Sequence, residues 1–225
     1  NSQLTSHLLN FNLLETLTYI GGSEKMFIMN RLLLILVLML SLQSWTKADD
    51  IRDFQIEGIS IGESLLNFIS LKKINQKINS YSDKGYIYKS KKYYALTFNS
   101  DDFSSNLKLY DQIQFHLKHK DTSYIIESLA GIKLYKENIS ECYSFLAKRE
   151  KEANSVFGKS NKEKLFIENK RNITKTIGYF YTLPDNSNMF IGCEDWNKDS
   201  NIPDDFALVL NSSEHQNWIN NEAYE

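Results

Sequence analysis

Alternating apolar and polar residues mark the strands that the sequence predicts. In residues 110–117, Ile113, Phe115 and Leu117 fall on one side of an extended chain and polar residues on the other, which is typical of a strand with one buried face. Residues 184–188 are rich in turn formers and predict a hairpin between two further apolar runs. The pattern predicts about six strands, at residues 93–98, 110–117, 124–134, 177–183, 189–196 and 205–210.

Apolar residues recur at helical spacing in other parts of the chain. A capping box at Ser60 and Glu63 begins the first of these helices. An apolar stripe after Asn138 predicts the longest helix, which Gly158 ends. The expected helices cover residues 61–69, 71–78, 138–157 and the stretch from residue 213.

The order of these elements indicates the fold class. Residues 159–171 are polar and basic, and we expect them to form a connector after the long helix. Three strands precede that helix and three follow it. The sequence therefore predicts an α+β fold with a mostly antiparallel sheet of about six strands packed on one long helix, a short N-terminal helix pair and a short C-terminal helix.

The N-terminal residues predict processing rather than folding. The first methionine is Met26, and residues 1–25 show no clear period, so we interpret them as translated upstream sequence that is not native. Arg31 then precedes an apolar run over residues 32–42 and a polar stretch that ends at Ala48, the pattern of a secretory signal peptide. The run is shorter than the roughly 20 apolar residues that span a bilayer. We therefore expect a signal peptide over residues 26–48, cleaved near Ala48, and no transmembrane anchor in the mature form.

The mature chain is then a single domain over residues 49–225, located in the periplasm or secreted. The full chain has 225 residues, of which 42% are hydrophobic and 24% charged, with a net charge of −2. These values are typical of a globular protein. They give no reason to expect a nucleic acid or an anionic membrane as partner.

Two cysteines exclude a zinc site with four cysteines. In an exported protein a lone pair predicts a disulfide between Cys142 and Cys193. A reactive thiol is the alternative, but no motif of a cysteine nucleophile surrounds Cys142.

Oxygen-bearing side chains alternate in one loop near the C-terminus. Asp195, Asn197 and Asp199 have the spacing of a calcium-binding loop. However, Ser200 stands in place of the turn glycine and Phe206 in place of the bidentate glutamate. The loop is a candidate calcium site, with a solvated polar loop as the alternative.

No familiar catalytic motif occurs in the chain. A hydrolase site could still be assembled from scattered residues, and its candidate parts are His116, Glu127, Asp195 and Asp205. Otherwise we expect His116 on the exposed polar face of its strand, and His215 without an obvious partner.

Several stretches of the mature chain resemble a family of small exported proteins from AT-rich marine alphaproteobacteria of the SAR11 type. The resemblance covers almost the whole mature chain and implies the same signal-peptide boundary and paired cysteines. The stretches are residues 48–62 (ADDIRDFQIEGISIG), 92–94 (KYY), 113–118 (IQFHLK), 138–143 (NISECY), 193–196 (CEDW) and 218–224 (WINNEAY).

These observations favour a binding function. We expect an exported, envelope-associated binding or protein-interaction domain that is not an enzyme, with an envelope protein or a small ligand as partner. The alternatives are a periplasmic hydrolase and a calcium-stabilised structural module. No cofactor is expected apart from calcium.

Overall fold

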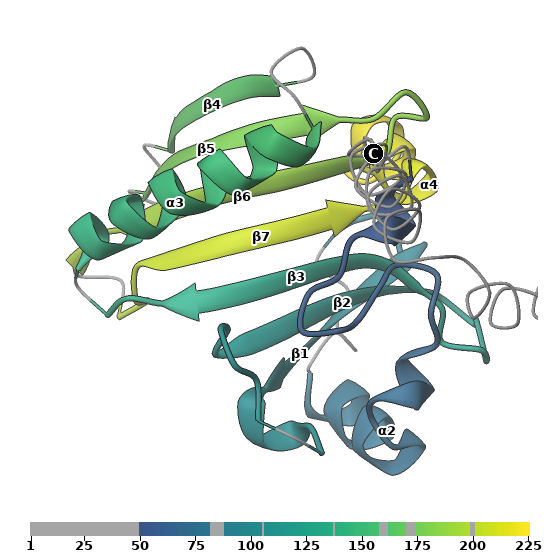
Figure 1. Cartoon of the computed structure of the whole chain (residues 1–225). Coiled ribbons are helices and arrows are strands. Elements are labelled where there is room, and N and C mark those ends of the chain that lie inside the picture. The colour runs from purple at the N-terminus through teal and green to yellow at the C-terminus, as the bar shows by residue number, and fades with distance from the viewer. Residues whose placement is uncertain are drawn as a thin grey trace, which may run out of the picture. The chain divides into compact units, whose positions relative to one another are not determined.

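A computed structural model gives the structure of this chain (Figure 1). It describes residues 50–81, 88–104, 106–136, 138–157, 162–169, 174–198 and 201–225. The predicted upstream sequence and signal peptide, residues 1–25 and 26–48, lie outside the described residues. Within the described residues, no helix is both long and apolar enough to cross a membrane.

Seven strands form a single antiparallel sheet within the described part of the chain. The sheet order is β1-β2-β3-β7-β6-β5-β4, so two meanders meet where β3 pairs with β7. The antiparallel α+β class is thus confirmed. The strands are β1 (Tyr93–Asn99), β2 (Gln112–Lys118), β3 (Ile126–Leu134), β4 (Lys162–Asn169), β5 (Thr174–Thr182), β6 (Asn188–Trp196) and β7 (Asp205–Asn211).

The additional strand is β4, at one edge of the sheet (Figure 1). The sequence predicts a polar connector here, because charged residues occur on both sides of this strand and hide its alternation. Its backbone nevertheless pairs with β5 along the whole strand, from Lys162 opposite Tyr181 to Asn169 opposite Thr174.

The N-terminal helix pair is only partly confirmed. The second helix forms as α2 (Leu71–Ser80), whereas the first is replaced by a short 3-10 turn at Leu65–Asn67. Hydrogen bonds to the β2–β3 hairpin explain the difference, because the backbone N–H groups of Gly62 and Leu65 donate to carbonyl oxygens of that hairpin rather than along a helix.

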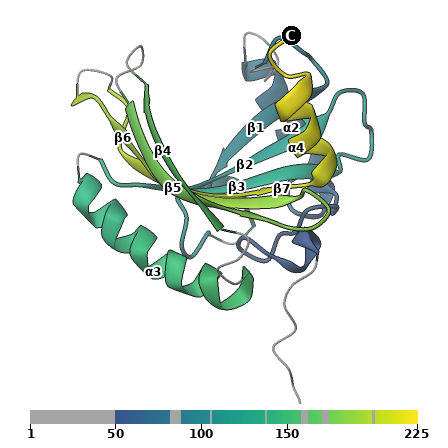
Figure 2. The same ribbon diagram turned by 90° about the horizontal axis from the view of Figure 1, so that it is seen from above.

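The long helix and the C-terminal helix lie on opposite faces of a strongly bent sheet (Figure 2). α3 (Ile139–Phe157) packs on β5, β6 and β7, and α4 (Ser213–Asn221) packs beside β3. The main core lies on the α3 face, where alternate strand residues such as Leu96, Phe115 and Leu129 are fully buried.

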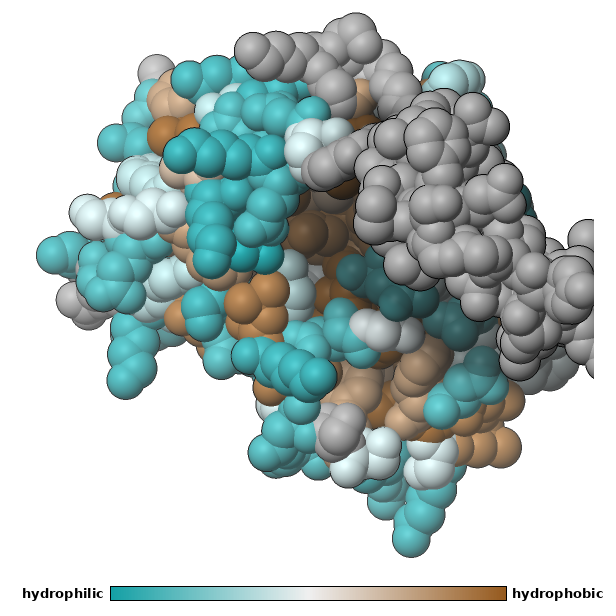
Figure 3. All heavy atoms as spheres, viewed as in Figure 1, coloured by the Kyte–Doolittle hydropathy of each residue, from teal (hydrophilic) through white to brown (hydrophobic). Residues whose placement is uncertain are grey.

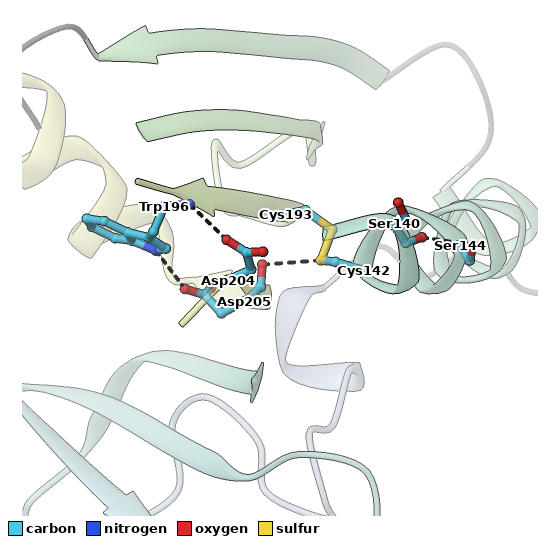
Figure 4. The surroundings of a disulfide bond; sticks show 7 residues. All are labelled: Ser140, Cys142, Ser144, Cys193, Trp196, Asp204 and Asp205. Carbon is cyan, nitrogen blue, oxygen red and sulfur yellow. Dashed lines mark hydrogen bonds between the residues drawn. A yellow bond between two sulfur atoms is a disulfide. The ribbon is translucent and has the colours of Figure 1, made fainter. Parts of the chain in front are cut away.

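The predicted disulfide is confirmed. Cys142 of α3 is bonded to Cys193 of β6, and their Cα atoms are 6.1 Å apart (Figure 4). Both cysteines are fully buried. The bond therefore fixes the first half of α3 to the centre of the β4–β7 meander.

Candidate functional site

An apolar pocket of about 360 Å³ lies between α3, the N-terminal segment and the sheet. Hydrophobic side chains are visible in the recess beneath α3 in Figure 3. Pockets for small ligands in other proteins have volumes of roughly 300–1,000 Å³. The described lining residues are Phe54, Gln55, Ile56, Glu57, Lys108, Leu109, Tyr110, Arg149, Glu152, Ala153, Val156, Phe157, Met189, Ile191 and Leu208.

One wall is a continuous stripe of α3. Its residues are spaced by three or four positions, which places them on one face of a helix. The floor continues from the disulfide, because Met189 and Ile191 precede Cys193 on the same face of β6. At the end of the wall, the ring of Phe54 stacks on Phe157 with centroids 4.5 Å apart. The wall residues are Arg149, Glu152, Ala153, Val156 and Phe157.

The opposite wall depends on a tight turn at Glu57 and Gly58. Both residues have positive φ angles, 55° and 82°, as a type I′ turn requires. The Glu57 carboxylate at the tip accepts hydrogen bonds of 3.0, 2.6 and 3.4 Å from the backbone N–H groups of Lys108, Leu109 and Tyr110. The charge of Glu57 is therefore used to hold the wall.

Gly131 of β3 allows this wall to approach the sheet. A Cβ atom at this position would lie 2.8 Å from the side chain of Ile56 and 2.9 Å from that of Tyr110. Both neighbours line the pocket. Burial raises the pKa of Tyr110 to about 12, so its hydroxyl is neutral at physiological pH.

Arg149 is a cation that lines the pocket, and one of its N–H groups has no hydrogen-bond acceptor in the described part of the chain. Its Nη1 forms an ion pair of 2.8 Å with Glu152, and its guanidinium lies 5.0 Å from the ring centre of Phe145. Its Nε atom is buried and has no hydrogen-bond partner among the described residues. A buried N–H without an acceptor costs about 1–3 kcal/mol.

The predicted hydrolase residues are placed in different parts of the fold. His116 is buried, not exposed on a polar face, and its Nδ1 lies 2.8 Å from Nε2 of His215. Both expectations for these histidines are therefore wrong, because α4 covers this part of the sheet. Glu127 lies nearby, where it pairs with Lys118 at 2.9 Å and accepts a hydrogen bond from Ser212.

The hydrogen bonds of Asn211 indicate which ring nitrogen of His215 carries the proton. The Asn211 side chain donates its amide N–H to Asn188, so its oxygen is the acceptor for Nδ1–H of His215 at 3.0 Å. Nε2 of His215 lies 2.8 Å from Nδ1 of His116, and Nε2 of His116 lies 3.3 Å from Oε1 of Gln114. Both rings are neutral, and burial lowers the pKa of His116 to about 4 and that of His215 to about 3.

Asp205 is far from this pair. His116 and Asn211 both lie opposite Ser128 of β3, one on each side of it. Asp205 is at the other end of β7 from Asn211, a distance of about 20 Å at roughly 3.3 Å per residue. The structure therefore does not bring Asp205 and His116 together.

Asp205 instead lies opposite Glu194 of β6. Burial and the Glu194 charge raise the pKa of Asp205 to about 7, although Nε1–H of Trp196 donates to its carboxylate at 3.1 Å (Figure 4). Burial also raises the pKa of Glu194. Sequence reasoning missed this pair because only the strand register places the two residues side by side.

Of the predicted calcium residues, Asp195 lines a second cavity, also of about 360 Å³. Asp195 and Trp196 line it, together with Asp204, whose carboxylate accepts the backbone N–H of Trp196 at 3.0 Å. Asp199 lies outside the described residues. The described residues contain no cluster of three or more histidine, cysteine, aspartate or glutamate side chains that could hold a metal ion, and Glu194 and Asp205 do not line this cavity.

The fold and the first pocket define a class: a disulfide-bridged α+β domain with an apolar pocket beneath its long helix. Comparison with known proteins gives no match, whether with family models, with curated proteins or with solved structures.

Proposed function

We propose that this chain is an exported binding domain that holds a small, largely apolar ligand with an anionic group in the pocket beneath α3. The observation that carries the proposal is the combination of apolar walls with the guanidinium of Arg149 in the lining of the pocket. The SAR11-type resemblance and the predicted signal peptide support export.

The walls favour an apolar body. Most lining side chains are aliphatic or aromatic, and Phe54, Leu109 and Leu208 keep part of their surface exposed. A ligand that covers such surface gains about 25 cal/mol for each Å² removed from water. A flexible hydrocarbon chain or an aromatic group would fit this recess.

The charged groups favour an anionic end. Glu57 is held by three backbone N–H groups and Glu152 by Arg149. Among the described lining residues, the cations are Arg149 and Lys108, and Lys108 is exposed. A guanidinium binds carboxylates and phosphates with directed hydrogen bonds.

The disulfide supports an extracytoplasmic location. Bonds of this kind form and persist in oxidising compartments and are rare in the cytosol. Cys142 and Cys193 are joined in the core, and no free cysteine is present among the described residues.

Titration calorimetry of the purified protein with decanoate tests the pocket. We expect binding to the wild type and loss of binding in A153M, because the longer side chain of this buried wall residue fills the recess. A147M is the matched control, since Ala147 is on the solvent face of the same helix. Equal binding to A153M and A147M, or no binding to the wild type, would contradict the proposal.

The same titration with R149M tests the anionic end. Hydrogen bonds to charged groups contribute about 1.5–3 kcal/mol, so decanoate affinity should fall by a factor of about 10 or more. Decanol, which has the same chain without the charge, should bind wild type and R149M equally. If R149M lowers the affinity for neither decanoate nor decanol, the pocket remains a binding site but Arg149 does not select the anion.

A further inference from the structure

β4 is an edge strand whose outer side is open. The sheet order leaves β4 without a second neighbour, and it lies at the upper edge in Figure 1. An edge strand presents a row of unpaired N–H and C=O groups. The other edge, β1, is partly protected because the hydroxyl of Tyr81 accepts the backbone N–H of Thr97. Among the described residues, no group bonds the outer backbone of β4.

The centre of β4 is apolar and exposed. Phe166 is 60% exposed and Ile167 is 48% exposed. Lys162 bonds to Glu150 of α3, so Lys164, Phe166 and Glu168, which alternate with it, lie on the α3 face of the strand. The exposure of Phe166 shows that α3 does not cover this edge. β4 thus offers both unpaired backbone and unburied apolar surface.

The charges on β4 are arranged for self-pairing. Lys164 precedes Phe166 by two residues and Glu168 follows it by two. In an antiparallel pair of two β4 strands centred on Phe166, Lys164 of each copy lies opposite Glu168 of the other, and Leu165 opposite Ile167. One pair of opposite charges then lies on each side of the two-fold axis, where the two Phe166 rings meet.

One of the two neighbouring registers is clearly less favourable. A shift of one residue places Glu163 opposite Glu168, and like charges directly opposite each other are destabilising. In a parallel, in-register pair every charged residue lies beside the same residue of the other copy, so like charges meet along the whole strand. We propose that β4 pairs antiparallel with β4 of a second copy in the register centred on Phe166, which joins the two sheets into one.

Charge reversal with rescue tests this pairing in the full chain. Sedimentation equilibrium should find a dimer for the wild type and for the double variant K164E/E168K. K164E alone should raise the dimer dissociation constant by about tenfold or more, because two pairs per dimer change from attraction to repulsion. Glu168 also lies opposite Lys175 within its own sheet, so E168K is used only in the double variant.

K148E is the control, because Lys148 is exposed on α3 and its reversal changes the net charge equally. It should leave the dimer unchanged, and circular dichroism should show that all variants are folded. A monomeric wild type would overturn the proposal and leave the edge for a strand of another protein. A dimer that K164E and K148E affect equally, or that the double variant does not restore, would also overturn it.

Discussion

His116 and His215 connect the sheet to α4 through a chain of neutral hydrogen bonds. Their rings contact each other, and the His215 ring packs edge-on against Tyr93 with centroids 5.0 Å apart. The nearest charges belong to Lys118, Glu127 and Glu214, which form ion pairs on the rim of this cluster. The interior is therefore built for uncharged imidazoles.

This arrangement predicts a loss of stability in acid. Unfolded histidine has a pKa near 6.5, whereas that of folded His116 is about 4, so the unfolded state binds more protons between these values. The contribution of His116 is present above about pH 6.5 and falls by about 3 kcal/mol on acidification to pH 4. Urea unfolding at several pH values measures this loss.

Two variants separate this effect from the titration of carboxylates. H116Q should lower stability at pH 7 but reduce the further loss between pH 6.5 and 4. H119Q, at a histidine outside the buried pair, should retain the acid sensitivity of the wild type. Parallel stability curves for wild type and H116Q would refute the assignment.

At the scale of single elements, strands with one buried face are read from the sequence more reliably than exposed ones. β2 shows clear alternation because Ile113, Phe115 and Leu117 are all fully buried. β4 shows none, since most of its residues are exposed and the pairing with β5 is made by backbone. The failed helix at residues 61–69 has another cause, because contacts distant in sequence outweigh local helical spacing.

The disulfide gives a prediction for α3. Cys142 and Cys193 are 51 positions apart, and a closed loop of this length contributes about 4 kcal/mol in the chain-entropy model. C142A/C193A should lower the free energy of unfolding by about this amount, as measured with urea. Wild-type protein in reducing agent should resemble the variant. An unchanged urea midpoint would show that packing alone holds α3.

For the whole molecule, the fold class was accessible from the sequence but the pocket was not. Its walls come from five separate segments, at residues 54–57, 108–110, 149–157, 189–191 and 208. Only the helical stripe from Arg149 to Phe157 has a local pattern, and that pattern equally fits an ordinary core. The turn at Glu57 and the close approach over Gly131 become meaningful only once the sheet register is known.

The proposed export concerns the whole chain and has its own test. In a bacterial host with two membranes, we expect the protein to be recovered from the periplasm with Asp49 as its first residue, as determined by N-terminal sequencing. A48W should retain the precursor, because the cleavage site requires a small residue. Recovery of uncleaved wild-type protein from the cytoplasm would contradict this expectation.

The bond between Cys142 and Cys193 closes a covalent ring that contains β4, β5 and the turn at residues 183–187. A protease that cuts once inside this ring opens it without releasing either piece. The cut chain would keep its mass on a non-reducing gel and separate into two fragments only after reduction. The outer strands are thereby protected against loss in the same oxidising surroundings in which the bond forms.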